Sequence, residues 1–367
     1  MDIIIQREAL LKPLQAVSGV VEKKQTLPIL SNVLLMIRDN KLLLIGTDLE
    51  IELIGVVPLQ SLQTEGSTTV SARKLFDICR TLPEGSDIHL FLEKNNLVVR
   101  AGESSFRLNT LSPKDFPNLE QGELQVKFPV RQSQFKSLLT KTYFAMGQQD
   151  VRHYLNGSFL EIGQQTIKCV AADGHRLALT TIQDDRIGDI EAKLILPRKS
   201  VLELIRLLNG DGEEDALISA GDGKFQVVTD EFTFTTKLIN AQYPDYRRLV
   251  PVGNAIAVAE RDVIKQALTR TSILSNEKFR GVRFQLEPTK LRISANNSDQ
   301  EHAEEDLALT YSGNSMEIGF NVAYLLDVVS SISSKFISCA FTDPNNGVLI
   351  KAEEDEDSLY VVMPMRL

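Results

Sequence analysis

The sequence repeats itself at an interval of about 125 residues, and this repetition limits the possible fold more than any single motif does. The segments that begin at Leu30, Leu155 and Phe279 align without a gap over nineteen positions. Each segment predicts two strands of alternating apolar residues joined by a short polar turn, at 38–41, 163–166 and 287–290. We therefore expect three copies of one structural unit.

Amphipathic helices are predicted at matching places in the three copies. One precedes each hairpin, at 7–21, 131–146 and 260–275, and a second follows it, at 71–83, 197–209 and 320–333. Strands that come in antiparallel runs between helices are typical of an α+β fold rather than of alternating βαβ units. The predicted domains are N-terminal, central and C-terminal, at 1–122, 129–248 and 252–367.

The composition is that of a folded chain without membrane spans. Hydrophobic residues make up 43% and charged residues 24%, and no apolar run is long enough to cross a bilayer. The first residues lack the features of a signal peptide, so we expect a cytoplasmic protein. Cys79, Cys169 and Cys339 are far apart and odd in number, which predicts free, buried thiols rather than disulfides or a thiolate metal site.

The charge of the chain is unevenly distributed. The net charge is -9, which argues against nonspecific nucleic-acid binding by the whole surface. Five of the six predicted helices are nevertheless net positive, and the six together carry +8. Solvated helices usually mix both signs, so this pattern favours a local nucleic-acid surface. It also allows a second interpretation, a peptide-binding hub whose basic helices pack internally or meet an acidic protein.

Simple geometry relates these helices to DNA. If six helices lined a ring at a spacing of about 10 Å, the hole would be only roughly 10 Å wide, whereas twelve helices from two chains would leave roughly 28 Å. Only the larger hole admits a B-DNA duplex, which is roughly 20 Å across. Contacts with phosphates alone would be independent of sequence and would permit sliding.

Enzyme and metal sites find little support. The chain has no phosphate-binding loop, no hydrolase motif and no paired histidines with metal-ligand spacing. Asp173, Gly174 and His175 form the best catalytic candidate, since a carboxylate can orient an imidazole, and a hydrolase is the weakest alternative. The first repeat has Asp48 in the same register, which favours a recurring strand end. Acidic runs at 301–306 and 353–357 are typical of solvated loops. We predict no catalytic residue, no metal and no cofactor.

Several longer motifs extend over the whole chain, and the last two are highly specific. They are Gln25–Asn32, Gly46–Glu50, Asp173–Leu177, Tyr243–Arg248, Leu274–Arg283 and Tyr360–Leu367. In these motifs the chain resembles the bacterial sliding clamps, the beta subunits of DNA polymerase III. The resemblance implies a noncatalytic processivity factor, in which two chains join head to tail as a closed ring of six similar domains with helices lining the central channel.

The resemblance also implies the partners. They are a second copy of the chain, double-stranded DNA bound without regard to sequence, the alpha subunit of the replicative polymerase, the clamp loader, translesion polymerases, mismatch repair proteins and ligase. No membrane partner is implied.

The partner-peptide pocket of the family maps onto residues that suit varied apolar ligands, because methionines and branched aliphatic side chains adapt their shape. Ala172 stands where threonine is usual, and Gly347 where serine is frequent. The mapped residues are Leu155, Ala172, Gly174, His175, Arg176, Leu177, Pro244, Arg248, Leu249, Val348, Val361, Val362, Met363, Pro364 and Met365.

The DNA contacts of the family map onto Lys24, Arg73, Arg80, Gln149, Arg152, Tyr154, Arg198, Lys199 and Arg206. Lys24 replaces a frequent arginine, which keeps the charge but loses the bidentate fork, and His153 replaces a tyrosine. The dimer seam maps onto Lys74, Ile78, Leu82, Phe106 and Leu108 on one edge and Ile273, Leu274, Glu301 and Glu304 on the other. Glu103 replaces a basic residue, which puts one ion pair of the family in doubt.

Overall fold

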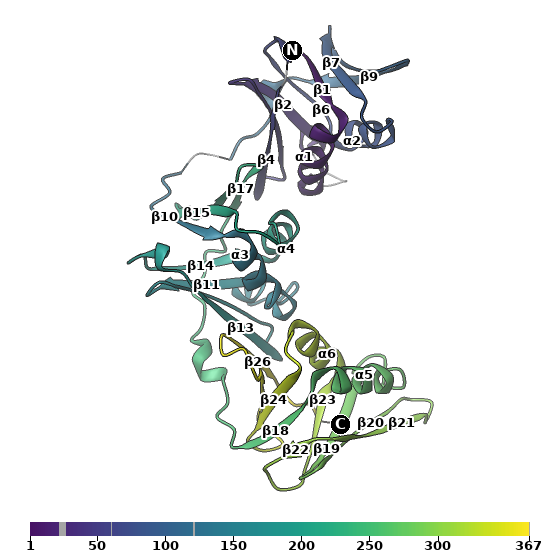
Figure 1. The fold of residues 1–367 in the computed structure, drawn as a ribbon, viewed down its shortest axis with the longest axis vertical. Helices are drawn as coiled ribbons and strands as arrows, with labels where there is room; N and C mark the ends of the chain where they lie inside the picture. The colour runs from purple at the N-terminus through teal and green to yellow at the C-terminus, as the bar shows by residue number, and fades with distance from the viewer. Residues whose placement is uncertain (22–26, 60, 120–121, 367) are drawn as a thin grey trace. The chain divides into compact units, whose positions relative to one another are not determined.

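The computed structural model describes residues 1–21, 27–59, 61–119 and 122–366, and it confirms a three-domain α+β fold built from one repeated unit (Figure 1). The elements of the first repeat are β1 (Asp2–Gln6), α1 (Arg7–Val20), β2 (Asn32–Arg38), β3 (Lys41–Thr47), β4 (Ile51–Pro58), β5 (Ser61–Thr64), β6 (Ser67–Ser71), α2 (Ala72–Thr81), β7 (Asp87–Glu93), β8 (Asn96–Ala101) and β9 (Ser104–Leu111).

The second and third repeats follow the same order. The second contains β10 (Val126–Arg131), α3 (Gln132–Thr140), β11 (Gly157–Gly163), β12 (Thr166–Ala172), β13 (Arg176–Gln183), β14 (Ala192–Pro197), α4 (Arg198–Leu207), β15 (Asp215–Gly221), β16 (Lys224–Val228) and β17 (Phe232–Lys237). The third contains β18 (Ala255–Glu260), α5 (Arg261–Ser272), β19 (Gly281–Glu287), β20 (Lys290–Asn296), β21 (His302–Ala308), β22 (Thr310–Tyr311), β23 (Met316–Asn321), α6 (Val322–Ser331), β24 (Phe336–Phe341), β25 (Val348–Ala352) and β26 (Ser358–Val362).

The predicted hairpins and helices are confirmed, with one correction. The three hairpins close on the pairs Arg38 with Lys41, Gly163 with Thr166, and Glu287 with Lys290. The stretch 131–146 is not one helix, because α3 ends at Thr140 and a separate 3-10 turn follows. Near this end the Thr142 hydroxyl donates to two helix carbonyls, a local bond that competes with continued helix.

Sheets run from one repeat into the next. Strand β17 pairs with β4, and strand β26 pairs with β13, both antiparallel. One sheet has the order β10-β15-β16-β17-β4-β3-β2-β6-β9-β8-β7-β1-β5, the second β14-β11-β12-β13-β26-β25-β24-β18-β22, and the third β21-β20-β19-β23. The chain therefore forms two compact units, 1–132 with 206–238 and 133–205 with 239–367, because the second repeat shares its strands with both neighbours.

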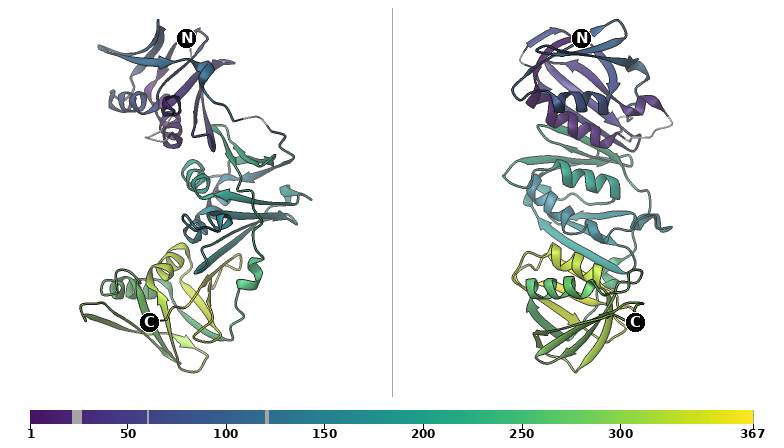
Figure 2. Two further views of the ribbon diagram at one scale, coloured as in Figure 1. Left: turned by 180° about the vertical axis from the view of Figure 1, so that it is seen from behind. Right: turned by 90° about the vertical axis from the view of Figure 1, so that its right-hand side faces the viewer.

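The first and third repeats hold their two helices together in the same way. Helices α1 and α2 lie side by side, and so do α5 and α6 (Figures 1 and 2). Arg7, at the start of α1, donates to the carbonyls of Cys79 and Arg80 at the end of α2. Arg261, at the start of α5, likewise donates to the Ile332 carbonyl after α6. A cation at a helix C-terminus satisfies carbonyls that lack partners and interacts favourably with the helix dipole. These two arginines therefore hold neighbouring helices together, in agreement with the alternative interpretation that the basic helices pack internally.

All three cysteines are free, as expected; Cys79 and Cys169 are buried, whereas Cys339 is only partly buried. Burial raises the pKa of the Cys79 thiol to about 12 and that of Cys169 to about 11, so both stay protonated at neutral pH. Within the described residues, no helix is both long and apolar enough to cross a bilayer.

Candidate functional site

An apolar cavity of about 260 Å³ lies on the second compact unit. It unites nine of the residues expected for the partner-peptide pocket: Leu155, Ala172, Gly174, Arg176, Leu177, Pro244, Leu249, Val361 and Met363. Arg152 and Tyr154, which were expected to contact DNA, line it as well. The side chains of Leu249 and Met363 are 54% and 42% exposed, so apolar surface is open to a ligand.

The floor of this cavity follows from strand register. Ala172 on β12 lies opposite Leu177 on β13, and Leu177 lies opposite Val361 on β26. These three buried side chains therefore form one row across three strands. The departure Ala172 leaves the row without the hydroxyl that a threonine would carry.

A tight turn forms the wall of the cavity next to this row. Gly174 has a φ of +91°, which disfavours any other residue, and a Cβ there would lie 2.9 Å from a guanidinium nitrogen of Arg152. The Asp173 carboxylate holds the turn by accepting hydrogen bonds from the backbone amides of His175 and Arg176. Asp48 holds the corresponding turn of the first repeat in the same way, as the sequence register predicts.

Arg176 joins the second repeat to the third. Its side chain is only 11% exposed and forms ion pairs with Asp173, at 3.0 Å, and with Asp327 of α6. It also donates to the Phe144 carbonyl and stacks over the Tyr324 ring, with 4.4 Å from Cζ to the ring centroid. A planar guanidinium can make all of these contacts at once, which a lysine cannot.

The other expected pocket residues surround the cavity rather than line it. Met363 donates its backbone N–H to the His175 carbonyl, and Met365 donates to the Gly319 carbonyl, so the C-terminal segment is held in place. Val348 and Val362 are a buried cross-strand pair. The remaining residues are Arg248, which pairs with Asp245 at the surface, and Pro364, which follows Met363.

The departure Gly347 lies close to the cavity. A Cβ at this position would lie 2.9 Å from Val361 and 3.0 Å from the Met363 sulfur. A serine there would therefore require the side chains of Val361 and Met363 to shift.

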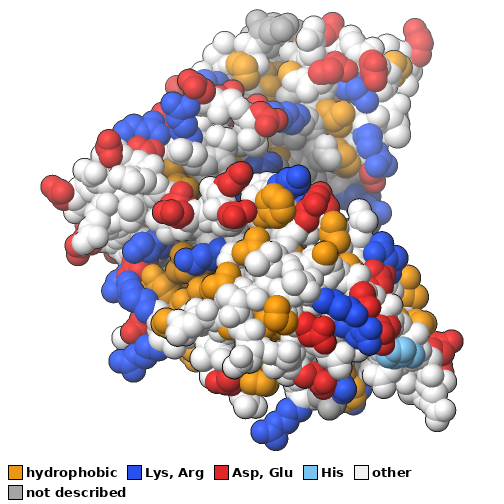
Figure 3. All heavy atoms as spheres, turned by 60° about the horizontal axis from the view of Figure 1, so that its bottom comes forward, with side chains coloured by type: hydrophobic (Ala, Val, Ile, Leu, Met, Phe, Trp, Pro, Cys, Tyr) orange, Lys and Arg blue, Asp and Glu red, His pale blue; other side chains and the backbone are white. Residues whose placement is uncertain are grey.

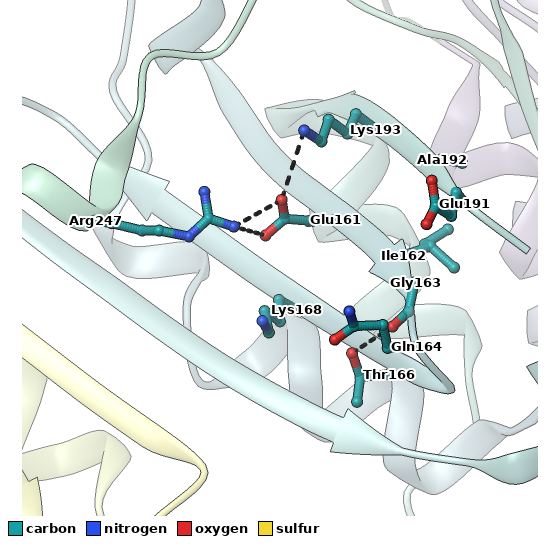
Figure 4. A pocket seen from close by; sticks show the side chains of 10 residues that line it. All are labelled: Glu161, Ile162, Gly163, Gln164, Thr166, Lys168, Glu191, Ala192, Lys193 and Arg247. Atoms are coloured by element: carbon teal, nitrogen blue, oxygen red, sulfur yellow. Dashed lines mark hydrogen bonds and ion pairs between the residues drawn. The ribbon is translucent and has the colours of Figure 1, made fainter.

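A second, charged hollow of about 490 Å³ was not predicted from the sequence (Figure 4). Its centre is Glu161 on β11, whose cross-strand neighbours are Lys168 and Lys193. Arg247 donates to both Glu161 oxygens, at 2.9 and 2.8 Å, and the Tyr246 hydroxyl donates to one of them at 2.8 Å. Burial raises the pKa of the Glu161 carboxyl, but these hydrogen bonds outweigh burial, and the pKa lies below its ordinary value.

The residues expected to contact DNA fall into several settings. Arg73 and Arg80 extend from α2, are 73% and 61% exposed, and both approach Asp77. Arg206 donates to the Ala16 carbonyl. Arg198 is half-buried, donates to two carbonyls, and has a pKa lowered by burial and by nearby Arg176.

Two other expected DNA contacts, Gln149 and Arg152, lie in the segment between α3 and β11. Arg152 forms a close ion pair with Asp150 and lowers the pKa of that carboxyl to about 2. Gln149 has a positive φ, and Lys199 lies in the first turn of α4. Lys24 lies outside the described residues.

The expected seam residues lie on two edge strands, β9 and β21, and at the helices α2 and α5. On β9, residues 104–109 pair with β8 alone, and β21 pairs with β20 alone, within the part of the chain that the structure describes. Ile273 is 75% exposed and Leu274 is half-buried, whereas Leu82 and Leu108 are already buried within the chain. Of the other seam residues, Ile78 and Phe106 are partly buried. The exposed ones are Lys74, Glu301 and Glu304.

The acidic run on β21 is largely neutralised by ion pairs. Glu305 pairs with Arg270, and Glu304 and Asp306 both pair with Arg292. Acidic and basic side chains are also interspersed over the face drawn in Figure 3. Among the described residues, no group of three or more histidine, cysteine, aspartate or glutamate side chains could hold a metal ion.

Comparison with known proteins identifies the family. Models of the N-terminal, central and C-terminal domains of the DNA polymerase III beta subunit match residues 1–120, 129–245 and 247–366. The beta sliding clamps of Pseudomonas putida and Pseudomonas aeruginosa are 47% and 48% identical to the chain, over the full length of both proteins. A crystal structure of the Pseudomonas aeruginosa sliding clamp bound to griselimycin superimposes with a TM-score of 0.97, at 47% identity and complete coverage. The chain therefore belongs to the bacterial beta sliding clamps, the homodimeric processivity factors of DNA polymerase III.

Proposed function

We propose that the apolar cavity is the site at which this chain holds the peptides of its partners. The buried row of Ala172, Leu177 and Val361, with the exposed side chains of Met363 and Leu249 beside it, carries this assignment, because an apolar floor with an adaptable methionine rim suits varied apolar side chains. The partners are the alpha subunit of the replicative polymerase, the clamp loader, translesion polymerases, mismatch repair proteins and ligase, which would compete for one cavity. The same cavity is a candidate site for griselimycin, which is bound to the clamp of Pseudomonas aeruginosa.

The experiment replaces Met363 and Met365 with alanine and measures peptide affinity by calorimetry. Loss of the Met363 side chain removes contact area at the rim, so we expect affinity for a partner peptide to fall about tenfold or more. Dimerisation should be unchanged, because neither residue belongs to the proposed seam. Unchanged peptide affinity would refute the assignment.

The seam between two chains is proposed from the internal junctions. In the β17–β4 junction, Phe234 lies opposite Leu53. Phe106 holds the position of Phe234 in the first repeat, and Ala303 on β21 holds that of Leu53 in the third. If the seam copies this junction, β9 of one chain pairs with β21 of the other, and Phe106 faces Ala303 of the partner subunit. Ile273 and Leu274 would then pack beside this strand pair, with Lys74 near the acidic side chains of β21.

We propose that the DNA contacts come from cations of α2 and α4 rather than from every basic residue of the helices. Arg73, Arg80, Lys199 and Arg206 lie on α2 and α4, where contact with phosphates would be independent of sequence. Arg7 and Arg261 are excluded from this role, since both are bonded to helix ends. Arg152 and Tyr154 are assigned to the cavity wall.

We further propose that the chain has no catalytic activity of its own and works in the cytoplasm, where a clamp would meet chromosomal DNA. Both Asp173 oxygens are already engaged, one by two backbone amides and the other by Arg176, which leaves the His175 ring without an orienting carboxylate from this residue. The three domains are proposed to have the boundaries 1–122, 129–248 and 252–367, close to the ranges of the family models. If His175→Ala abolished a hydrolytic turnover, the noncatalytic assignment would fail.

A further inference from the structure

The charged hollow and the apolar cavity lie on the same face of one sheet. Side chains alternate along a strand, so Lys168, Val170 and Ala172 of β12 point to one face. Lys168 lines the hollow and Ala172 lines the cavity, and Val170 is fully buried between them. Four residues along a strand span about 13 Å. A single extended segment of a partner could therefore reach both places.

The turn that separates the two places is firmly held. It is η6 (Tyr246–Leu249), which carries Arg247 into the hollow and Leu249 into the cavity. Tyr246 is buried against Phe159 and hydrogen-bonds to Glu161, and Arg247 closes on the same carboxylate. The turn is therefore a fixed boundary between two preformed sites rather than a segment that must fold on binding.

The cations of the hollow are not all used within the chain. Arg247 donates hydrogen bonds to both oxygens of the Glu161 carboxylate. Lys193 Nζ lies 3.8 Å from Glu161 Oε1, which is close enough for an ion pair but beyond hydrogen-bond distance. Lys168 forms no ion pair with any carboxylate in the part of the chain that the structure describes. Each lysine keeps donors for an anion. Lys168 and Lys193 lie on the two sides of Glu161, and Glu191 stands two residues before Lys193, so an anion should contact the lysine ammonium groups away from these two carboxylates (Figure 4).

We propose that this hollow binds acidic side chains of a partner, on the stretch that flanks the apolar residues held in the neighbouring cavity. The inference rests on the proposed peptide-binding function. An extended chain advances about 3.3 Å per residue, so the acidic residues should stand about four residues or slightly more from the apolar ones. The hollow thus adds charge and spacing to what the apolar cavity can select.

The test uses synthetic peptides with the same apolar centre of leucine and phenylalanine. After a spacer of about four serines, on either side of the centre, one set carries three glutamates and the other three serines. Two exposed, charge-assisted contacts should strengthen binding to the wild-type chain about threefold to tenfold in low salt, measured by calorimetry. The gain should disappear when the glutamates directly adjoin the apolar centre.

Charge-reversal variants locate the effect. The pair K168E and K193E should abolish the gain from glutamate and leave affinity for the serine peptide unchanged, which also shows that the cavity is intact. The pair K41E and K94E changes the net charge equally, at exposed lysines of the first repeat, and should keep the gain. The pair K168Q and K193Q repeats the test with a milder change in case charge reversal disturbs folding.

Distinct results would overturn the proposal. It fails if glutamates give no gain on the wild-type chain, or if the gain survives in both the K168E/K193E and the K168Q/K193Q proteins. It also fails if a short DNA duplex, rather than the acidic peptide, binds with dependence on Lys168 and Lys193, because the hollow would then be a nucleic-acid site. If the serine peptide itself does not bind the wild-type chain, the cavity assignment fails first and this inference fails with it.

Discussion

Replacing Ile273 with alanine should weaken the dimer strongly without harming the fold. In the single chain the Ile273 side chain is 75% exposed, so it contributes little to the stability of the chain itself. Full burial of an isoleucine side chain is worth about 1.5–3 kcal/mol, and burial of the exposed three quarters at a seam is worth about 1–2 kcal/mol. A head-to-tail dimer has two identical seams, so the loss doubles to about 2–4 kcal/mol, or about 30-fold to 1,000-fold in the dimer dissociation constant.

The assay is sedimentation over a range of concentrations, with circular dichroism to check the fold. Val252 is the matched control, because it is an aliphatic residue that is 85% exposed and lies outside the proposed seam. V252A should leave the dimer unchanged. Replacing both Ile273 and Leu274 with aspartate should produce folded monomers, since it would put charge into an apolar contact. Equal shifts for I273A and V252A, or a dimer of the aspartate variant at micromolar concentration, would refute the placement of the seam.

Two further predictions concern the link between the second and third repeats and the charged hollow. R176M leaves the carboxylates of Asp173 and Asp327 without their guanidinium partner. Because Asp327 is half-exposed, we expect the free energy of unfolding to fall by about 2–3 kcal/mol, which lowers the melting temperature by about 5–10 °C. R176K should give an intermediate melting temperature. An equal melting temperature for R176M and wild type would contradict this role. E161Q should lower the melting temperature by about 2–4 °C at pH 7. Because the folded pKa of Glu161 lies below the ordinary 4.5, its contribution is present above about pH 4.5 and is lost as the pH falls through the folded value, so the two melting curves should converge in acid. A difference that persists at low pH would show that the carboxylate charge is not the cause.

Features that depend on local periodicity could be predicted from the sequence. The hairpins at 38–41, 163–166 and 287–290 and all six helices occur where apolar spacing and repetition placed them, because turn residues and amphipathic spacing act over short stretches. The predicted end of α3 was wrong, since the composition remains helical beyond Thr140 whereas the helix ends there and a 3-10 turn follows at Tyr143–Ala145.

Features that depend on pairing between distant strands could not be predicted. The row of Ala172, Leu177 and Val361 requires the register of β13 with β26, which no local pattern gives. The resemblance to the clamp family supplied these residues instead. It placed Arg152 and Tyr154 among DNA contacts but not in the pocket, although both line the cavity, and their position next to Leu155 was the available signal. The hollow around Glu161 was missed because its three cations come from separate segments.

Not all of the positive charge on the predicted helices faces solvent. Every basic residue of the helices entered the charge count from the sequence, but the side chains of Arg7 and Arg261 donate hydrogen bonds to carbonyls at helix ends within their own repeats. Net charge in a sequence window cannot distinguish a cation that faces solvent from one that closes a helix. The exposed set that remains, with Arg73 and Arg80 as its clearest members, is the one that the proposed DNA contact depends on.

The most direct measurement loads the protein onto a nicked circular duplex with the clamp loader of the same bacterium and follows its retention after the circle is cut. Two chains that close around the duplex are linked to it topologically, so the protein should remain on the circle in high salt, where phosphate contacts are screened. It should slide off once the DNA is linear. Equal retention on circular and linear DNA, with loss from both as salt rises, would contradict encirclement and indicate ordinary electrostatic binding.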